Sequence, residues 1–112
     1  MTTNERRLTL EDQRSTLRGE LAALGADPDR DEVTFAGDAG FSDRSHSTEE
    51  RAHVLATAET LRTNLREVER ALVKIDEGTG DVCDRCGEPI GAERLAAIAW
   101  ATLCLDCKKA TA

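Results

Sequence analysis

The sequence predicts a mostly α-helical protein: an antiparallel two-helix coiled-coil hairpin followed by a small module built on four cysteines. Apolar residues recur at helical spacing in two segments, and an acidic stretch without this spacing separates them. Two Cys-x-x-Cys pairs then follow near the end of the chain. We therefore expect a hairpin over residues 1–77, with a tip loop at about 26–46, and a four-cysteine module over residues 78–112.

The first helical segment has leucines at helical spacing, and Arg14 occupies the position that would complete an alternation of four and three. Thr9 and Asp12 resemble a capping pair at its start, and Gly25 is a usual signal for the C-terminal end of a helix. The sequence thus predicts a helix from about Leu10 to Leu24. Its apolar positions are Leu10, Leu17, Leu21 and Leu24.

The second helical segment has a clearer pattern. Ser47 and Glu50 form a capping box, apolar residues then alternate at spacings of four and three, and Gly78 follows the last of them. This is the pattern of a coiled-coil seam, and pairing with the first helix would bury both seams. A heptad pattern can equally recruit a second chain, so the oligomeric state stays open. The seam residues are Val54, Ala58, Leu61, Leu65, Val68, Leu72 and Ile75.

Residues 26–46, between the two helical segments, are rich in Asp and Glu. A long loop at the tip of a helical hairpin is either a solvated linker or a functional segment. Val33, Phe35 and Phe41 favour the second reading, because apolar side chains beside carboxylates suit contact with a partner.

Charge and composition restrict the class of protein. The chain of 112 residues carries 22 acidic and 15 basic side chains, a formal charge of −7. This excess of acid argues against a protein that holds nucleic acid mainly through its phosphates. A protein partner is therefore favoured. No apolar run suits a membrane span or a signal peptide, so we expect a cytoplasmic protein.

The four cysteines, Cys83, Cys86, Cys104 and Cys107, follow the pattern C-x2-C-x17-C-x2-C. In the cytoplasm such cysteines are better interpreted as metal ligands or redox groups than as disulfides. Each C-x2-C pair places two thiolates on one tight turn, and two such turns complete a tetrahedron around Zn²⁺. We thus expect a C4 zinc-finger module with one structural zinc ion. The cluster packed on it is expected to contain Ile90, Leu95, Ile98, Trp100 and Leu103.

Four thiols in such a pattern have two other uses in proteins. A thiol switch or dithiol oxidoreductase lacks the βαβ pattern that usually accompanies it, whereas the spacing alone also fits an iron–sulfur cluster. No catalytic constellation is present, because His46 and His53 are the only histidines and zinc would use every cysteine. We therefore expect no catalytic residues and no enzyme activity.

Three stretches around the cysteines carry a family resemblance: Ala71 to Thr79, Cys83 to Ile90, and Glu93 to Leu95. They resemble the signature of the DksA/TraR family of bacterial transcription factors. The resemblance implies a regulator that binds RNA polymerase directly through its secondary channel, and not promoter DNA. It also implies that acids at the hairpin tip approach the active centre, and that guanosine tetraphosphate acts jointly with the polymerase.

The family's tip motif, Asp-x-x-Asp-x-Ala, aligns its last three positions with Asp43, Arg44 and Ser45. The resemblance makes these the expected partner-binding residues, with Asp38 as a substitute for the acid that Gly40 replaces. Since the tip departs from the family motif, a second hypothesis stands beside the first. In it the chain is a coiled-coil and zinc-finger interaction module with a different protein partner.

Overall fold

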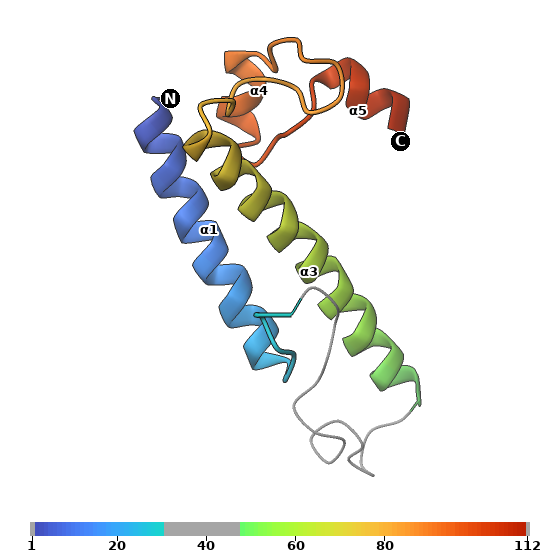
Figure 1. Ribbon diagram of the computed structural model, residues 1–112. Helices are drawn as coiled ribbons and strands as arrows, with labels where there is room; N and C mark the ends of the chain where they lie inside the picture. Colours follow the sequence, from blue (N-terminus) through green and yellow to red (C-terminus); the bar gives the residue numbers. More distant parts are fainter. Residues whose placement is uncertain (1, 31–47, 112) are drawn as a thin grey trace. The chain divides into compact units, whose positions relative to one another are not determined.

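The computed structural model describes residues 2–30 and 48–111. It contains the helices α1 (Thr3–Ala23), α3 (Thr48–Asp76), α4 (Ala92–Ala97) and α5 (Leu105–Thr111). These ranges contain no β-strand, although Val82 and Pro89 form an isolated β-bridge and Ala26 also has a bridge assignment. The predicted mostly helical fold class is confirmed, with two long helices and two short ones (Figure 1).

Helix α1 begins earlier than the sequence predicted. The cap is not formed by Thr9 and Asp12. Instead Thr2 Oγ1 accepts a hydrogen bond from the Glu5 N–H at 3.1 Å, a pair with the same three-residue separation. Arg6 and Leu10 are both buried, so tertiary contacts stabilise two turns that show no apolar periodicity. The prediction of the helix start near Leu10 was therefore wrong.

Both long helices end as predicted, each followed by a glycine with positive φ. The values are 86° at Gly25 and 81° at Gly78, a conformation that costs glycine little. The two ends have the hydrogen bonds of the Schellman motif. The longer bonds run from Ala26 N to Leu21 O at 3.0 Å and from Thr79 N to Lys74 O at 2.8 Å.

The chain forms two compact units, each containing part of α1 and part of α3. The first unit consists of residues 1–14 and 66–112, and the second of residues 15–65. The predicted domain boundary between residues 77 and 78 stays a prediction.

In the first unit, ion pairs show that α1 and α3 run antiparallel. Arg7 pairs with Asp76, and Arg14 Nε lies 3.5 Å from Glu69 Oε2. A step of seven residues forward along α1 thus matches a step of seven backward along α3. Arg14, which interrupts the apolar spacing of the first helix, takes an exposed position at the edge of this pairing.

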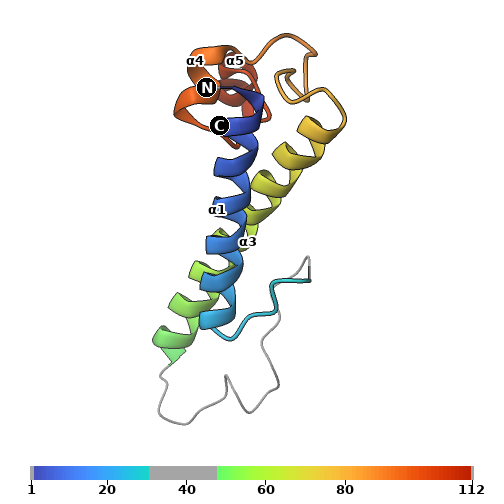
Figure 2. The same ribbon diagram turned by 90° about the vertical axis from the view of Figure 1, so that its left-hand side faces the viewer.

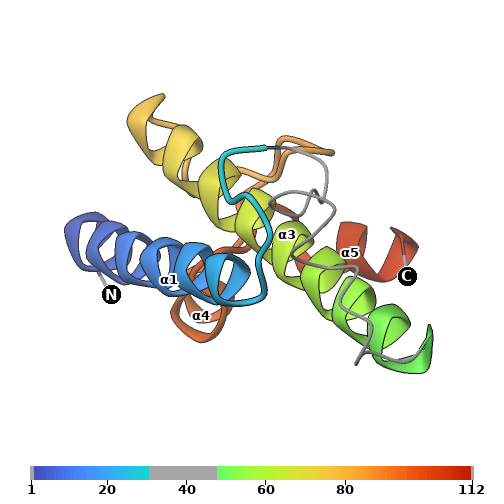
Figure 3. The same ribbon diagram turned by 90° about the horizontal axis from the view of Figure 1, so that it is seen from below.

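The second unit has an apolar core contributed by both helices. Arg62, although charged, is 3% exposed and donates to the Asp27 carbonyl at 2.9 Å, which holds the segment after α1 against α3 (Figure 3). The antiparallel pairing of the two predicted seams is therefore present in this unit too. The buried residues of the core are Leu21, Ala26, Ala58 and Leu65, and Leu17, Leu24 and Leu61 pack against them.

The remainder of the first unit consists of turns and two short helices. Helix α4 has six residues and lies near the first turns of α1 (Figures 1 and 2). Helix α5 has seven residues and carries one of the predicted metal ligands, Cys107. In the part of the chain that the structure describes, no helix is both long and apolar enough to span a bilayer.

Candidate metal centre

The structure brings the four predicted ligands, Cys83, Cys86, Cys104 and Cys107, to one point. Their Sγ atoms all lie within 4.8 Å of one another, and Cys86 Sγ is 3.8 Å from Cys104 Sγ. A tetrahedral zinc site with Zn–S bonds of about 2.3 Å requires S···S separations of about 3.8 Å. The thiols therefore fit a zinc ion, and four of them leave no open coordination position for a substrate. Within the described ranges, no other group of His, Cys, Asp or Glu has this arrangement.

The first cysteine pair lies on a tight turn stabilised by its own backbone. The Arg85 N–H donates to Cys83 Sγ at 3.4 Å, and the Gly87 N–H donates to the Cys83 carbonyl at 3.1 Å. Gly87, directly after this pair, has φ 77°, a left-handed conformation that costs glycine little. The Cys83 N–H donates in turn to the Glu88 carbonyl at 2.8 Å. These bonds therefore hold Cys83 and Cys86 together on one tight turn.

The second cysteine pair uses the start of a helix. Cys104 immediately precedes α5 and Cys107 lies in its first turn, where the Lys108 N–H donates to the Cys104 carbonyl at 2.9 Å. The two pairs are joined by a bond from the Asp84 N–H to the Thr102 carbonyl at 2.8 Å. Residues distant in sequence thereby form one site.

The thiols influence one another's ionisation. The backbone amide of Cys86 lowers the pKa of Cys83 to about 6, whereas the neighbouring thiol of Cys104 raises the pKa of Cys107 to about 12. The four thiols by themselves thus favour a state in which some are ionised and others stay protonated, because adjacent thiolates repel. A divalent cation removes this repulsion, and zinc binding deprotonates all its cysteine ligands.

An apolar cluster packs on the metal site. Most of its predicted members are present, but Trp100 is not one of them. Trp100 lies half-buried beside a cavity of about 130 Å³ that is also lined by Glu67, Arg94 and Lys108. A turn closed by the bond from Ala101 N to Ile98 O at 3.0 Å buries Ala101 in the cluster instead. The apolar cluster members are Ile90 and Ala101, with Leu95, Ile98 and Leu103 packed against them.

Helix α3 holds the first cysteine pair through the carboxylate of Asp84, which lies between the two cysteines. Arg70 donates to both Asp84 oxygens, at 3.1 and 2.9 Å, and Lys74 Nζ donates to Oδ1 at 2.8 Å. Lys74 also donates to the Val82 carbonyl at 2.6 Å and is only 2% exposed. The bonds from Arg70, together with the charge of Lys74, lower the pKa of Asp84 to about 2.

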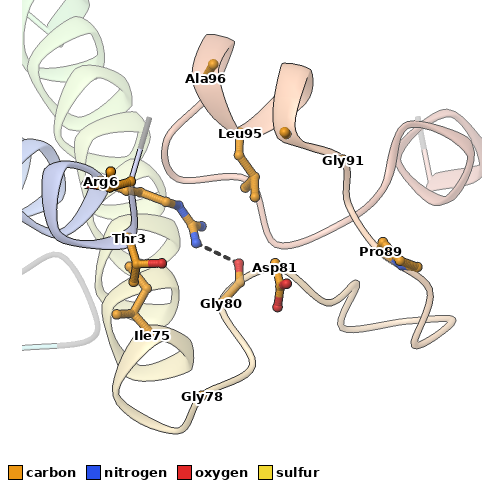
Figure 4. A pocket seen from close by; sticks show the side chains of 12 residues that line it. Thr3, Arg6, Ile75, Gly78, Gly80, Asp81, Pro89, Gly91, Leu95 and Ala96 are labelled. Carbon is orange, nitrogen blue, oxygen red and sulfur yellow. Dashed lines mark hydrogen bonds between the residues drawn. The ribbon is translucent and has the colours of Figure 1, made fainter.

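Helix α1 holds the same module through Arg6. Its guanidinium donates to the carbonyls of Gly80 at 2.6 Å, Ala99 at 2.8 Å and Ala101 at 3.3 Å. The side chain points from α1 toward the loop that carries Gly80 (Figure 4). Burial lowers the pKa of Arg6 from its ordinary value. Sequence reasoning missed this residue, although its position four before Leu10 places it on the buried face of the helix.

The predicted tip residues, Asp38, Asp43, Arg44 and Ser45, lie outside the described residues, and so does Ser47 of the predicted capping box. The described start of the tip loop packs on the helices. Asp29 N donates to Asp27 Oδ1 at 2.9 Å, and Arg18 Nη1 donates to the Pro28 carbonyl at 3.3 Å. The tip assignments thus stay predictions.

Comparison with known proteins supports the assignment of the metal. Residues 77–110 match the family model described as the prokaryotic dksA/traR C4-type zinc finger. The chain belongs to the DksA/TraR family. The four clustered cysteines of this DksA/TraR protein hold a structural zinc ion.

Curated relatives resemble part of this DksA/TraR chain. It is 39% identical over 79 residues to the RNA polymerase-binding transcription factor DksA of Haemophilus influenzae, covering 70% of this chain and 53% of that protein. It is 45% identical over 60 residues to an uncharacterized protein of Aquifex aeolicus, covering 54% of this chain and 40% of that protein. The chain thus spans about half the length of the curated relatives it matches.

Solved structures cover nearly the whole chain. Transcription factor DksA2 from Pseudomonas aeruginosa is 28% identical with a TM-score of 0.63, covering 97% of this chain and 81% of that one. The DnaK suppressor protein from Agrobacterium tumefaciens is 25% identical with a TM-score of 0.66, covering 98% of this chain and 94% of that one. The resemblance therefore extends beyond the zinc finger to the long helices.

Proposed function

We propose that this protein is a bacterial transcription regulator that binds RNA polymerase directly. The observation that carries the proposal is the combination of a 29-residue helix, α3, with a C4 finger of the DksA/TraR family joined directly to its end. The name of the Haemophilus influenzae relative states that this relative binds RNA polymerase. The long paired helices and the partner of the relative together support polymerase as the partner here.

The zinc module supports the proposed function mechanically. Arg6 and Lys74 each join the module to one of the long helices, so the ends of both helices are fixed to the metal-bound turns. A pair of helices fixed in this way is suited to entering a narrow channel of a larger partner. We propose that this channel is the secondary channel of the polymerase.

The tip carries the proposed regulatory action. Asp43 would approach the catalytic centre, with Asp38, Arg44 and Ser45 as its neighbours in contact with the polymerase. A carboxylate near the catalytic magnesium changes the local electrostatics of the centre and the conformation of nearby loops. In this proposal the protein alters transcription without performing chemistry. Guanosine tetraphosphate is proposed to act jointly with the polymerase.

Protein–protein contact is proposed as the mode of action in the cytoplasm, without sequence-specific binding to promoter DNA. The net charge of −7 supports this, because a protein that binds DNA through phosphates needs a basic surface. The closed set of four thiol ligands likewise supports a non-enzymatic protein, since a catalytic zinc needs an open position.

Transcription by purified bacterial RNA polymerase tests the proposal. The zinc-loaded protein is expected to change the yield of initiation, and Asp43→Asn is expected to abolish that change. Polymerase binding should stay within about twofold, since a single charge contributes little to affinity. Asp12→Asn, a change of an exposed carboxylate on α1, is the matched control and should behave as the original protein. An unchanged effect with Asp43→Asn would remove Asp43 from the mechanism.

A second candidate is an interaction module for a different protein partner. Gly40 and Ser45 stand where the family motif has Asp and Ala, and these departures favour a changed partner. Under this alternative the zinc site and the helices keep their structural roles, but the protein has no effect on transcription by the polymerase.

A further inference from the structure

We propose that Arg6 is a positioning residue that couples zinc binding to the docking of helix α1. In this proposal the start of α1 is held in place only when both cysteine pairs are joined at one metal. The inference concerns the first unit alone and does not depend on the polymerase as partner.

The positions of the acceptor carbonyls carry the inference. Gly80 lies three residues before Cys83, and Ala101 lies three residues before Cys104. These cysteines are the first ligands of the two pairs, so Arg6 bonds at equivalent positions on both halves of the site. When the metal joins the halves, it fixes the separation of these two carbonyls. Arg6 can therefore bond both carbonyls only when the metal joins the two halves.

The surroundings of Arg6 make these bonds necessary for the docked state. The side chain is 5% exposed, and within residues 2–30 and 48–111 no carboxylate forms an ion pair with it. Asp81 is the acid whose charge acts on it favourably from nearby. A buried cation whose acceptors move away loses the groups that replaced its water. We therefore expect the first turns of α1 to leave the module when the acceptors separate.

A cavity lies beside Arg6 at the start of α1. It has a volume of about 460 Å³ and lies between the start of α1, the Gly78–Asp81 loop and helix α4 (Figure 4). Apolar side chains from α3 and α4, Ile75 and Leu95, line this space. The hydrogen bonds of Arg6 thus run from α1 to the turns that precede the cysteines.

Coupling between two equilibria is reciprocal. If zinc strengthens the docking of Arg6 by some factor, then docked Arg6 strengthens zinc binding by the same factor. Replacement of Arg6 should consequently lower the affinity for zinc, although this residue is not a ligand. A merely structural contact of α1 would not produce this matched pair of effects.

Hydrogen exchange of residues 3–14 is the first readout, measured with and without a zinc chelator. Chelation is expected to reduce their protection about tenfold in the original protein, within the usual range of coupling between sites. In Arg6→Met, protection should be low from the start and should change less than about twofold on chelation. Arg7→Met is the matched control, because Arg7 pairs with Asp76 on α3 and should keep the full response.

Zinc affinity, measured by competition with a chelator of known affinity, is the second readout. Arg6→Met should bind zinc about tenfold more weakly than the original protein, and Arg7→Met should bind it equally well. If Arg6→Met proves unfolded, Arg6→Lys serves instead, because it keeps the charge but lacks the forked donors that reach both halves. The proposal would be overturned if the variant that folds, Arg6→Met or Arg6→Lys, binds zinc as tightly as the original protein. It would also be overturned if residues 3–14 of Arg6→Met show the full response to chelation.

Discussion

Lys74 of helix α3 donates a hydrogen bond of 2.8 Å to Asp84, the residue that follows the first zinc ligand. The lysine is almost completely buried, and the carboxylate also accepts two bonds from Arg70. A buried ammonium is tolerated only when acceptors replace the water it has lost. The pair therefore makes the end of α3 and the first cysteine turn a single structural element.

Replacement of this lysine tests the link. Lys74→Met keeps most of the side-chain volume but leaves the Val82 carbonyl without its donor, so we expect the free energy of unfolding to fall by about 1–3 kcal/mol. Denaturant unfolding of the zinc-loaded protein measures this. Lys109→Met, at an exposed position on α5, is the control and should leave the midpoint unchanged. An unchanged midpoint for Lys74→Met would show that the buried bond is not stabilising.

The partner residue gives a second, independent expectation. Asp84→Asn leaves the buried Lys74 charge without an anion, so adding Lys74→Met to this variant should cost less than adding it to the original protein. A double-mutant cycle with denaturant unfolding measures the difference. Strict additivity of the two changes would contradict direct coupling between the residues.

Two glycines should respond in opposite directions to alanine. A Cβ at Gly80 would lie 2.8 Å from Ile75 Cγ1 and 3.3 Å from Ile75 Cα, so Gly80→Ala should destabilise the protein by about 1–3 kcal/mol. At Gly19, inside α1, a Cβ meets nothing within 4 Å, and alanine should stabilise the helix by about 0.5–1 kcal/mol. Thermal unfolding of both variants checks the sign of each change in melting temperature. A melting temperature of Gly80→Ala equal to that of the original protein would contradict the packing at Gly80.

Removal of one thiol should disrupt the whole finger. Cys104→Ser leaves three thiol ligands, so we expect loss of zinc and loss of protection in α4 and α5, which have no buried residues of their own. Metal content by mass spectrometry under native conditions, with hydrogen exchange on the same sample, gives the measurement. A variant that keeps its full zinc content and normal protection would contradict the four-thiolate site.

The metal site and the pairing of the helices were predictable because each depends on a repeated spacing. The interval between Cys83 and Cys86 recurs at Cys104 and Cys107, and the seam from Ala58 to Ile75 follows a heptad. Such patterns are present in the sequence itself and need no knowledge of tertiary contacts.

The missed features depend on tertiary contacts. Arg6 and Lys74 are cations, a residue type that usually stays exposed, yet backbone carbonyls outside their own helices satisfy them when buried. The early start of α1 has the same origin, since its first turns are stabilised by the burial of Arg6. The sequence predicted Trp100 in the cluster packed on the zinc site, whereas the local turn buries Ala101 there.

Direct binding to purified bacterial RNA polymerase tests the central claim. The zinc-loaded protein, at micromolar concentration, is expected to bind the polymerase and to be displaced by a ligand known to occupy the secondary channel. Cys104→Ser, which disrupts the finger, should bind much more weakly. An intact, zinc-loaded protein that fails to bind, or that binds without being displaced, would contradict the proposed action through that channel.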